Sequence, residues 1–373
     1  MKAWPFLGIA IVQGVLLLAH WFIYGTLVAF WSPLGAGTTA VLRAVIFTLA
    51  FSFMVAALLG FAFSNPVVAG LYKIAALWLG FLNFFFWAAW LSWIVWLGIR
   101  LAGLGARMAG QRGAIADVLF FAALATGIYG LVNARWIRVR RVAVHMANLP
   151  AQWRGRVALL ASDLHLGNVN GPGFARRIAA MVERFAPDIV FFPGDVFDGS
   201  KADPDVLIAP LKAMKAPLGS YYSTGNHDEF GGAAQYDKAL TRVGVRVLTN
   251  EMVLVDGLQV VGVPYGDTTY PMRLKAMLEG LKLDPAVASV LLNHVPNRLP
   301  IVEQAGVGLQ LSGHTHGGQM FPFNWITRRV FGKFTYGLQA FGELKVYTSS
   351  GAGTWGPPMR VGTHPEVVLL RFE

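Results

Sequence analysis

The sequence of 373 residues contains no cysteine, which excludes disulfide bonds and thiolate metal ligands and leaves the redox compartment open. Acidic side chains are nearly missing from residues 1–141, where Asp117 is the single carboxylate beside ten lysines and arginines. The remaining residues carry 21 basic and 19 acidic side chains, so most of the net charge of +11 belongs to the first part. A nucleic-acid-binding domain would carry a basic patch on its folded body, so this distribution disfavours a nucleic-acid partner.

Charged residues are also rare in four long apolar stretches, at about residues 4–31, 40–63, 74–98 and 114–133. Each stretch reaches the roughly 20 residues that a helix needs to cross the hydrocarbon core of a bilayer. A cleaved signal peptide would account for one stretch but not for four. We therefore expect an α-helical transmembrane bundle of about four helices within residues 1–141, with the lipid bilayer as its partner.

Four arginines follow the fourth stretch directly, at positions 135, 138, 140 and 141. One interpretation is a clamp on anionic lipid headgroups, to which each charge would contribute about 1 kcal/mol. The other is a topology signal only, and the two are compatible. If Lys2 and Lys73 lie on the same side as these arginines, the positive-inside rule favours a cytoplasmic location for the rest of the chain.

Residues 142–373 have a different pattern, in which short buried strands alternate with helical segments. This alternation predicts an α/β layered catalytic domain after the membrane domain. The expected helices lie at residues 173–185, 203–215 and 271–281. The expected strands lie at residues 157–161, 188–192, 219–224, 245–249, 252–256, 258–263, 290–292, 309–311, 346–347 and 367–370.

Polar side chains follow five of these strands at the point where each strand ends, which is where open α/β sheets place their sites. A lone aspartate at a strand end is more simply a turn former, and Asn226 could form an Asx-turn, but five of the eight histidines of the chain fall in these fragments. Carboxylate, carboxamide and imidazole groups are ligands for hard-to-borderline divalent metals. The candidate metal ligands are Asp163, His165, Asp195, Asn226, His294, His314 and His316.

Seven ligands are too many for one tetrahedral ion, and they suit two ions that share Asp195. Two ions about 3.5–4 Å apart would clamp the attacking and leaving oxygens of an in-line displacement and would acidify a bridging water to the attacking hydroxide. His227 follows Asn226 directly and therefore points elsewhere, so we interpret it as a group that binds no metal and acts as a catalytic acid or stabilises the leaving oxygen. Asp228 would orient the ring of His227.

The motifs Asp-x-His, Gly-Asp, Gly-Asn-His-Asp, an isolated His and Gly-His-x-His-Gly-Gly-Gln, in this order, resemble the calcineurin-like metallophosphoesterase superfamily over about residues 155–373. The Gly-Gly-Gln ending, with the segments 350–353 and 357–360, is similar to the YkuE-like and YaeI-like subgroup, which resembles UDP-2,3-diacylglucosamine pyrophosphatases. The resemblance implies a four-layer α/β/β/α sandwich that binds two divalent ions, most often manganese, with zinc or iron as alternatives. It assigns Asp163, His165, Asp195 and His316 to one ion, and Asp195, Asn226, His294 and His314 to the other.

The resemblance further implies a metal-dependent hydrolase of phosphoric esters or pyrophosphates. Together with the apolar stretches, it leads us to expect a lipid-linked phosphodiester or pyrophosphate as the substrate, with UDP-2,3-diacylglucosamine as the concrete candidate in lipid metabolism. The expected location is the inner membrane of a bacterium, with the catalytic domain on the cytoplasmic face. Two alternatives stay open: an exported phosphodiesterase of the cell envelope, and a non-catalytic membrane scaffold or transporter with a phosphatase-like domain. No oligomeric state is predicted.

Residues 320–334, directly after the last histidine motif, mix aromatic and aliphatic side chains with Arg328, Arg329 and Lys333. One interpretation is a core helix or strand with a solvated edge. The other is an interfacial segment whose aromatic side chains enter the headgroup region while its cations hold lipid phosphates. Adjacency to His314 and His316 favours the interfacial interpretation.

Overall fold

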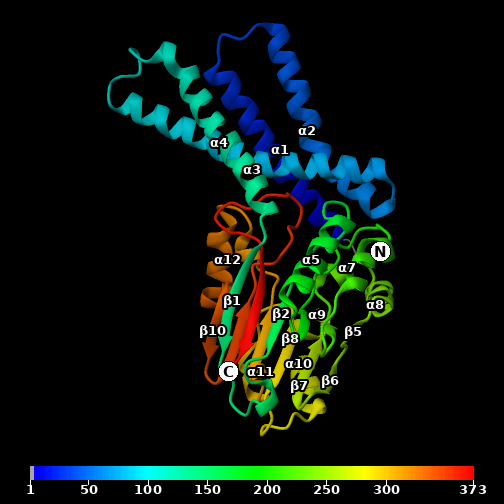
Figure 1. The fold of residues 1–373 in the computed structure, drawn as a ribbon. Coiled ribbons are helices and arrows are strands. Elements are labelled where there is room, and N and C mark those ends of the chain that lie inside the picture. Colours follow the sequence, from blue (N-terminus) through cyan, green and yellow to red (C-terminus); the bar gives the residue numbers. More distant parts are fainter. Residues whose placement is uncertain (1–3) are drawn as a thin grey trace. The chain divides into compact units, whose positions relative to one another are not determined.

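The computed structural model describes residues 4–373, with side chains described from Leu7 onward, so Lys2 of the topology argument lies outside the described residues. The chain divides into two compact units. The first is Met1–Val132 with Pro357–Met359, and the second is Asn133–Gly356 with Arg360–Glu373. Figure 1 shows the ribbon coloured along the sequence.

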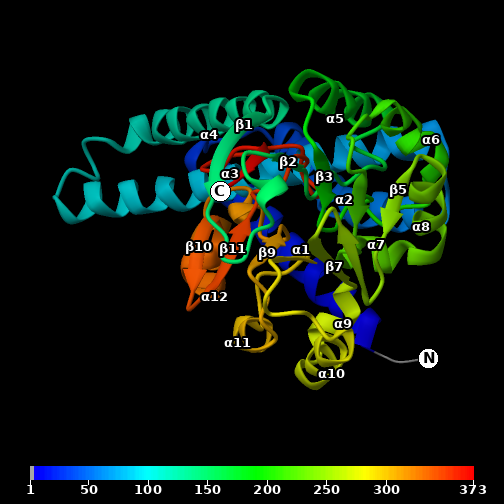
Figure 2. The ribbon, with the colours of Figure 1, turned by 60° about the horizontal axis from the view of Figure 1, so that its bottom comes forward.

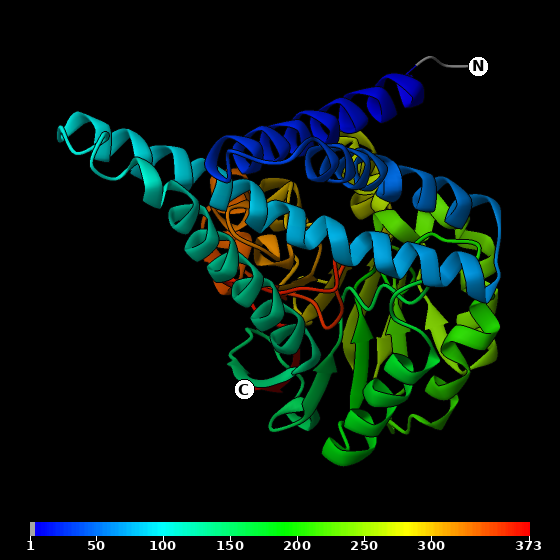
Figure 3. The same cartoon turned by 90° about the horizontal axis from the view of Figure 1, so that it is seen from above.

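Long helices build the first unit (Figures 1 and 3): α1 (Trp4–Phe30), α2 (Ala36–Ala62), α3 (Pro66–Leu101) and α4 (Arg112–Arg135). All four are long and apolar enough to cross a membrane, and this confirms the predicted spans. The helix α3 begins earlier than expected, because the side chain of Asn65 accepts a hydrogen bond from the backbone N–H of Val68 and Pro66 suits the first helical turn. Lys73 therefore lies inside α3 and not in a loop.

Two six-stranded sheets form the centre of the second unit. In each sheet four neighbouring strands run parallel to one another. The first sheet has the order β1 (Arg138–Val144), β12 (Glu366–Phe372), β2 (Val157–Leu160), β3 (Ile189–Phe192), β4 (Ser220–Tyr222) and β5 (Val245–Val247). The second has the order β10 (Gly337–Phe341), β11 (Leu344–Thr348), β9 (Leu309–Ser312), β8 (Ser289–Asn293), β7 (Leu258–Val263) and β6 (Glu251–Val255).

Each sheet is covered by helices on one face and by the other sheet on the opposite face. The strands therefore carry apolar side chains on both faces. Successive side chains of a strand point to opposite faces, so Leu160 and Phe191 pack against the other sheet, whereas Leu159 and Phe192 pack against helices. The helices α5 (Pro172–Phe185), α6 (Pro204–Ile208) and α8 (Ala233–Arg242) cover the first sheet. The helices α10 (Pro271–Leu281) and α11 (Leu299–Gln304) cover the second (Figure 2). The predicted four-layer α/β/β/α sandwich is confirmed.

Two segments differ from the sequence-based expectation. The helix expected over residues 203–215 ends at Ile208 and continues as a 3-10 turn over Ala209–Ala213, because Pro210 lacks the N–H that an α-helix requires. The basic segment after the fourth apolar stretch forms β1, an edge strand parallel to β12. Its charges protect an exposed sheet edge, and Arg140 donates a hydrogen bond to the hydroxyl of Tyr336 at 3.0 Å. The strand begins at Arg138, before the domain boundary expected after residue 141.

Candidate metal centre

All seven predicted ligands lie just past the carboxyl ends of strands, as expected. Asp163 and His165 follow β2, Asp195 follows β3, and Asn226 opens the short helix α7 (Asn226–Gly231) after β4. His294 follows β8, and His314 and His316 follow β9. The second sheet therefore contributes three imidazoles to a cluster whose carboxylates come from the first sheet.

The backbone of the cluster is held in a conformation that ordinary residues rarely adopt. Asp163, His165, Asp195, His314 and His316 have φ values of 53°, 46°, 52°, 67° and 49°, all in the left-handed region. Such strain costs free energy for residues with a Cβ, and it concentrates at functional sites. Gly225 makes room for the turn, because a Cβ at this position would lie 2.1 Å from an Asp195 carboxylate oxygen.

Asp163 forms the first half of the cluster with two imidazoles. Its Oδ1 lies 3.4 Å from Nε2 of His316 and 4.0 Å from Nε2 of His165, and the two ring nitrogens are 3.0 Å apart. Burial raises the pKa of Asp163 to about 6. Burial also lowers the pKa of His165 and, together with the charge of Arg360, the pKa of His316. Neutral imidazoles bind metals, so these groups have the charge state and the convergence that a divalent ion requires.

Asp195 connects this half of the cluster to the second. Its Oδ2 lies 3.2 Å from Nε2 of His294 and 3.8 Å from Nε2 of His165. Burial opposes ionisation, but His294, His165 and His227 hold the pKa of Asp195 well below its usual value. The Nδ1 atom of His294 is 2.9 Å from the carbonyl oxygen of Pro193, an arrangement that turns Nε2 toward the carboxylates.

His314 and Asn226 complete the second half. Nδ1 of His314 is 3.0 Å from Oδ1 of Asn226, and the rings of His314 and His294 have centroids 5.2 Å apart. Burial lowers the pKa of His314 to about 4, which again favours the neutral ligand form. The donor set of this half, with one carboxylate, one carboxamide and two imidazoles, has the chemistry of a divalent-metal site.

His227 points away from Asn226 but stays at the cluster. Its backbone N–H donates to Oδ1 of Asp195 at 2.9 Å, and its ring lies edge-on to that of His165 with centroids 4.9 Å apart. Its Nδ1 is 3.3 Å from the carbonyl oxygen of Asp198. The ring of Trp355 lies on another side, with centroids 5.5 Å apart. Since His165, Asp195 and His227 also bring ligand atoms within 4.8 Å of one another, the prediction that His227 binds no metal needs an experiment.

Asp228 differs from its expected role as the partner of the His227 ring. It is fully buried, and its carboxylate accepts hydrogen bonds from the backbone N–H groups of Asp195 at 2.7 Å, Gly225 at 2.8 Å and Phe197 at 2.9 Å. The reason is its position at the third residue of α7, where a side chain turns back to cap the start of the helix. Asp228 therefore positions the Asp195 loop, and the Asp198 carbonyl is the group that faces His227.

Arg360 is a site residue that residue-by-residue analysis of the sequence did not single out. It is fully buried, and its guanidinium donates hydrogen bonds to the carbonyl oxygens of His316 at 2.8 Å and Gly353 at 2.6 Å. The guanidinium nitrogen that donates to Gly353, Nη2, also lies 3.1 Å from Nδ1 of His316. Burial lowers the pKa of Arg360 to about 10. Its only signal in the sequence is its place in the segment 357–360, because burial of a lone arginine follows from tertiary packing.

Known proteins with similar sequences place this centre in a family. Residues 157–318 match the family described as Calcineurin-like phosphoesterase. An uncharacterized metallophosphoesterase of Aquifex aeolicus is 30% identical over 261 residues, which make up 68% of this chain and 98% of that protein. The chain belongs to the calcineurin-like metallophosphoesterase family.

Other metallophosphoesterases similar to this chain differ in length. A protein of Danio rerio described as a transmembrane protein with metallophosphoesterase domain is 31% identical over 261 residues, or 65% of this chain and 59% of that protein. The uncharacterized metallophosphoesterase YkuE of Bacillus subtilis is 28% identical over 282 residues, or 71% of this chain and 95% of that protein. The predicted family is confirmed, with YkuE and transmembrane proteins among the relatives. The chain spans 59% to 66% of the length of some curated relatives that it matches.

Metallophosphoesterases bind divalent ions, and this centre predicts how the affinity changes with pH. Burial alone would lower the pKa of His294, but Asp195 and Asp163 raise it to about 9 in the metal-free protein. His294 is therefore protonated at neutral pH and must lose its proton to become a ligand. We expect manganese affinity to rise by about tenfold per pH unit between pH 7 and 8, with release of about one proton per chain.

Calorimetric titration of the metal-free protein with manganese in two buffers of different ionisation enthalpy measures this proton release. The control is His294→Gln, which removes the titrating imidazole and should lower the release at pH 7.5 by about one proton per chain. Equal proton release in the variant and the unmodified protein would show that another group titrates.

Proposed function

We propose that this metallophosphoesterase is a membrane-bound, dinuclear hydrolase whose substrate is a lipid-linked phosphodiester or pyrophosphate, with UDP-2,3-diacylglucosamine as a candidate. The observation that carries the proposal is the convergence of two buried carboxylates and four imidazoles at the strand ends, with Asp195 between the two halves. When bound, two divalent ions would neutralise phosphate oxygens and lower the pKa of a water for in-line attack.

The residues of the chain would supply the remaining parts of the reaction. Asp195 holds both halves of the centre, and its own loop is fixed by Asp228. Arg360 fixes His316 through the carbonyl oxygen of that residue. His227 stands at the edge of the cluster, where its imidazole would donate a proton to the oxygen of the leaving group. Hydrolysis of a phosphodiester with a poor leaving group benefits from both activation by metal ions and such an acid, and the cluster supplies residues for each.

The helix α12 (Phe323–Phe331) supports a lipid substrate. None of its residues is buried, so α12 itself is not a core helix, whereas Met320 before it is buried and Phe334 after it packs against the core. Trp325 is 63% exposed and packs edge-on against Phe321, and Arg328 and Arg329 are also exposed. Exposed aromatic and basic side chains on one helix are typical of a segment that lies in a membrane interface. Together with four candidate spans in the same chain, this motivates a substrate that stays in the bilayer.

The direct test of the activity uses the full-length protein in detergent with manganese. We expect cleavage of bis-p-nitrophenyl phosphate, which releases p-nitrophenol. Chelation should abolish the activity and manganese should restore it. Failure to cleave this diester with manganese, zinc, iron or magnesium would overturn the proposed activity.

The double variant Trp325→Ser with Arg328→Ala tests the role of α12. We expect hydrolysis of a lipid phosphodiester in anionic vesicles to fall by about tenfold relative to hydrolysis of bis-p-nitrophenyl phosphate, because one cation and one aromatic anchor are lost. The matched control is Leu254→Ser with Arg246→Ala, which removes one exposed apolar side chain and one cation from β5 and β6. An equal loss on both substrates in the α12 variant would show that the helix is structural.

We also propose that the catalytic unit lies on the cytoplasmic face of the inner membrane. The support is the excess of basic residues around Arg135 and Arg138 at the end of the fourth span. Alkaline phosphatase fused after Glu373 should then be inactive, because that reporter is active only in the periplasm. An active fusion would favour an exported enzyme.

A further inference from the structure

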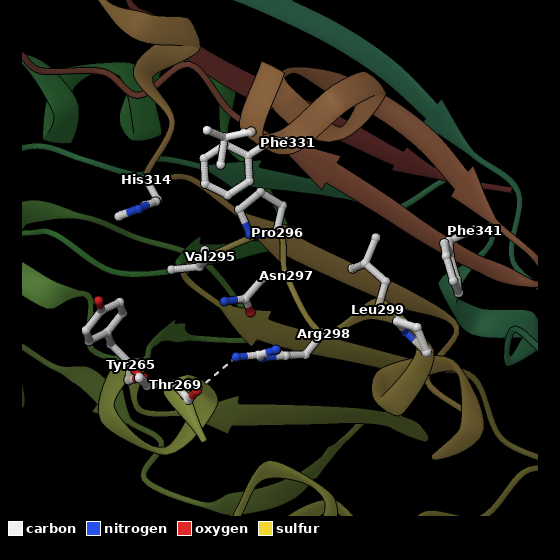
Figure 4. A pocket seen from close by; sticks show the side chains of 12 residues that line it. Tyr265, Thr269, Val295, Pro296, Asn297, Arg298, Leu299, His314, Phe331 and Phe341 are labelled. Carbon is white, nitrogen blue, oxygen red and sulfur yellow. Dashed lines mark hydrogen bonds between the residues drawn. The ribbon is translucent and has the colours of Figure 1, made fainter. Parts of the chain in front are cut away.

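A pocket of about 590 Å³ opens beside His314 within the second unit (Figure 4). Figure 4 shows His314 at one end and Phe341 at the other, with Val295, Leu299 and Arg298 along the walls. The volume lies within the range of roughly 300–1,000 Å³ that is typical of pockets for small ligands. A ligand in this pocket would therefore reach the metal centre with one end and extend away from it.

The entrance on the side of the metal centre is aromatic. The ring of His314 has centroid distances of 6.0 Å to the ring of Phe331 and 6.4 Å to the ring of Tyr265. These two rings come from α12 and from α9 (Tyr265–Thr269). A substituent of a phosphate held at His314 would thus leave the centre between two aromatic side chains.

The lining of the pocket is mostly apolar, with Arg298 as its one cation and with Asn297 and Thr269 among its polar residues. Val295 and Leu299 are buried parts of the body of the unit, at 4% and 5% exposure. Arg298 is exposed and donates a hydrogen bond to the carbonyl oxygen of Thr269 at 3.2 Å, and no acidic residue is among the twelve residues that line the pocket. Such a lining, mostly apolar with one cation and no carboxylate, suits a hydrocarbon chain attached to an anionic group.

We propose that this pocket binds the alkyl or acyl chain of the substrate, and that it sets the preference of the enzyme for amphiphilic phosphoesters. This inference rests on the proposed function, since it assumes that the phosphate lies at the metal centre. The residues that line the pocket would then distinguish a lipid-linked substrate from a small soluble one. Val330 and Phe331 of α12 form part of the wall, so the interfacial helix and the pocket are continuous.

The test is a series of p-nitrophenyl alkyl phosphates with methyl, butyl and hexyl chains, all soluble in water. The full-length protein is held in lipid nanodiscs, so that no detergent fills the pocket. We expect kcat/KM to rise with chain length, by up to about fourfold for each methylene that the pocket buries. The hexyl ester should therefore exceed the methyl ester by more than about tenfold.

Two variants test the walls. Val330→Trp places a bulky ring at the pocket and should lower the hexyl-to-methyl ratio of kcat/KM by about tenfold. Phe341→Ser removes the apolar end that lies away from His314 and should affect the hexyl ester more than the butyl ester. The matched control is Ile326→Trp, one turn earlier on α12. Ile326 and Val330 are both well exposed, at 57% and 67%, but only Val330 is among the lining residues. Ile326→Trp should keep the ratio of the unmodified protein.

A ratio that is independent of chain length, or one that Val330→Trp and Ile326→Trp change equally, would overturn the proposal. Calorimetric binding of hexylphosphonate against methylphosphonate gives a second readout without turnover. If no ester in the series is hydrolysed, the proposed function fails. Stronger binding of hexylphosphonate that is lost in Val330→Trp would then still support the pocket, and equal binding of the two phosphonates would refute it.

Discussion

Replacing Asp195 by asparagine should empty both halves of the metal centre. Asparagine is nearly isosteric and keeps one oxygen for the N–H of His227, but it removes the charge and the ligand atom that lies between His294 and His165. Loss of even an outer hydrogen-bond partner of a metal ligand costs about 10–100-fold in affinity, so loss of a shared ligand should lower turnover by more than about 100-fold. Elemental analysis of the purified variant measures the metal content.

Two other variants sharpen the result. His316→Ala should empty mainly one half, because His316 contacts Asp163 and His165 and is assigned to one ion only. Asp198→Asn is the control for a half-buried aspartate in the same loop. Its side chain accepts hydrogen bonds from the N–H groups of Asn168 and Ser200 and is not part of the cluster. Asp195→Asn with the metal content of the unmodified protein would contradict the shared role of Asp195.

Replacing His227 by alanine should lower turnover by roughly 10²–10⁴-fold while the metal content stays near that of the unmodified protein. The physical reason is that His227 faces the Asp198 carbonyl and the Trp355 ring, so its loss removes a proton donor and leaves the assigned ligands in place. A substrate with a very good leaving group needs less protonation. The loss should therefore be smaller for p-nitrophenyl esters than for alkyl esters.

Phe230→Ala is the matched control for this experiment. Its ring packs against His227 with centroids 5.8 Å apart, so the variant removes a neighbouring aromatic side chain and keeps the imidazole. We expect Phe230→Ala to keep the ratio between the two kinds of ester. If His227→Ala instead loses metal in step with activity, His227 is a ligand, as its proximity to His165 and Asp195 allows.

Much of the fold and the location of the centre could be predicted because they follow from local patterns. Buried strands such as residues 189–192 and 290–292 are continuous apolar runs, and a polar residue soon after such a run lies at the sheet edge. The helices at residues 172–185 and 271–281 have one apolar face each, and their ends were predicted to within one residue. The four membrane spans follow from length and hydropathy alone.

Other features depend on contacts between distant segments and could not be predicted. We expected Asp228 to face His227. Its position as the third residue of α7 instead turns its carboxylate toward the N–H groups of Asp195 and Phe197. The sequence of the basic segment at Arg138 suggests a membrane anchor. Its strand conformation depends on pairing with β12, which is far away in the sequence. The burial of the Arg360 guanidinium and the pocket beside His314 both depend on contacts between segments that are far apart in the sequence.

The most direct test of the account is a manganese titration of the metal-free, full-length protein, with bound metal and hydrolysis of bis-p-nitrophenyl phosphate measured on the same samples. The account predicts binding of two ions per chain, with hydrolysis appearing only as the second site fills. It also predicts that Asp195→Asn loses both events together. Hydrolysis that persists in the metal-free protein, or full activity with one bound ion, would contradict it.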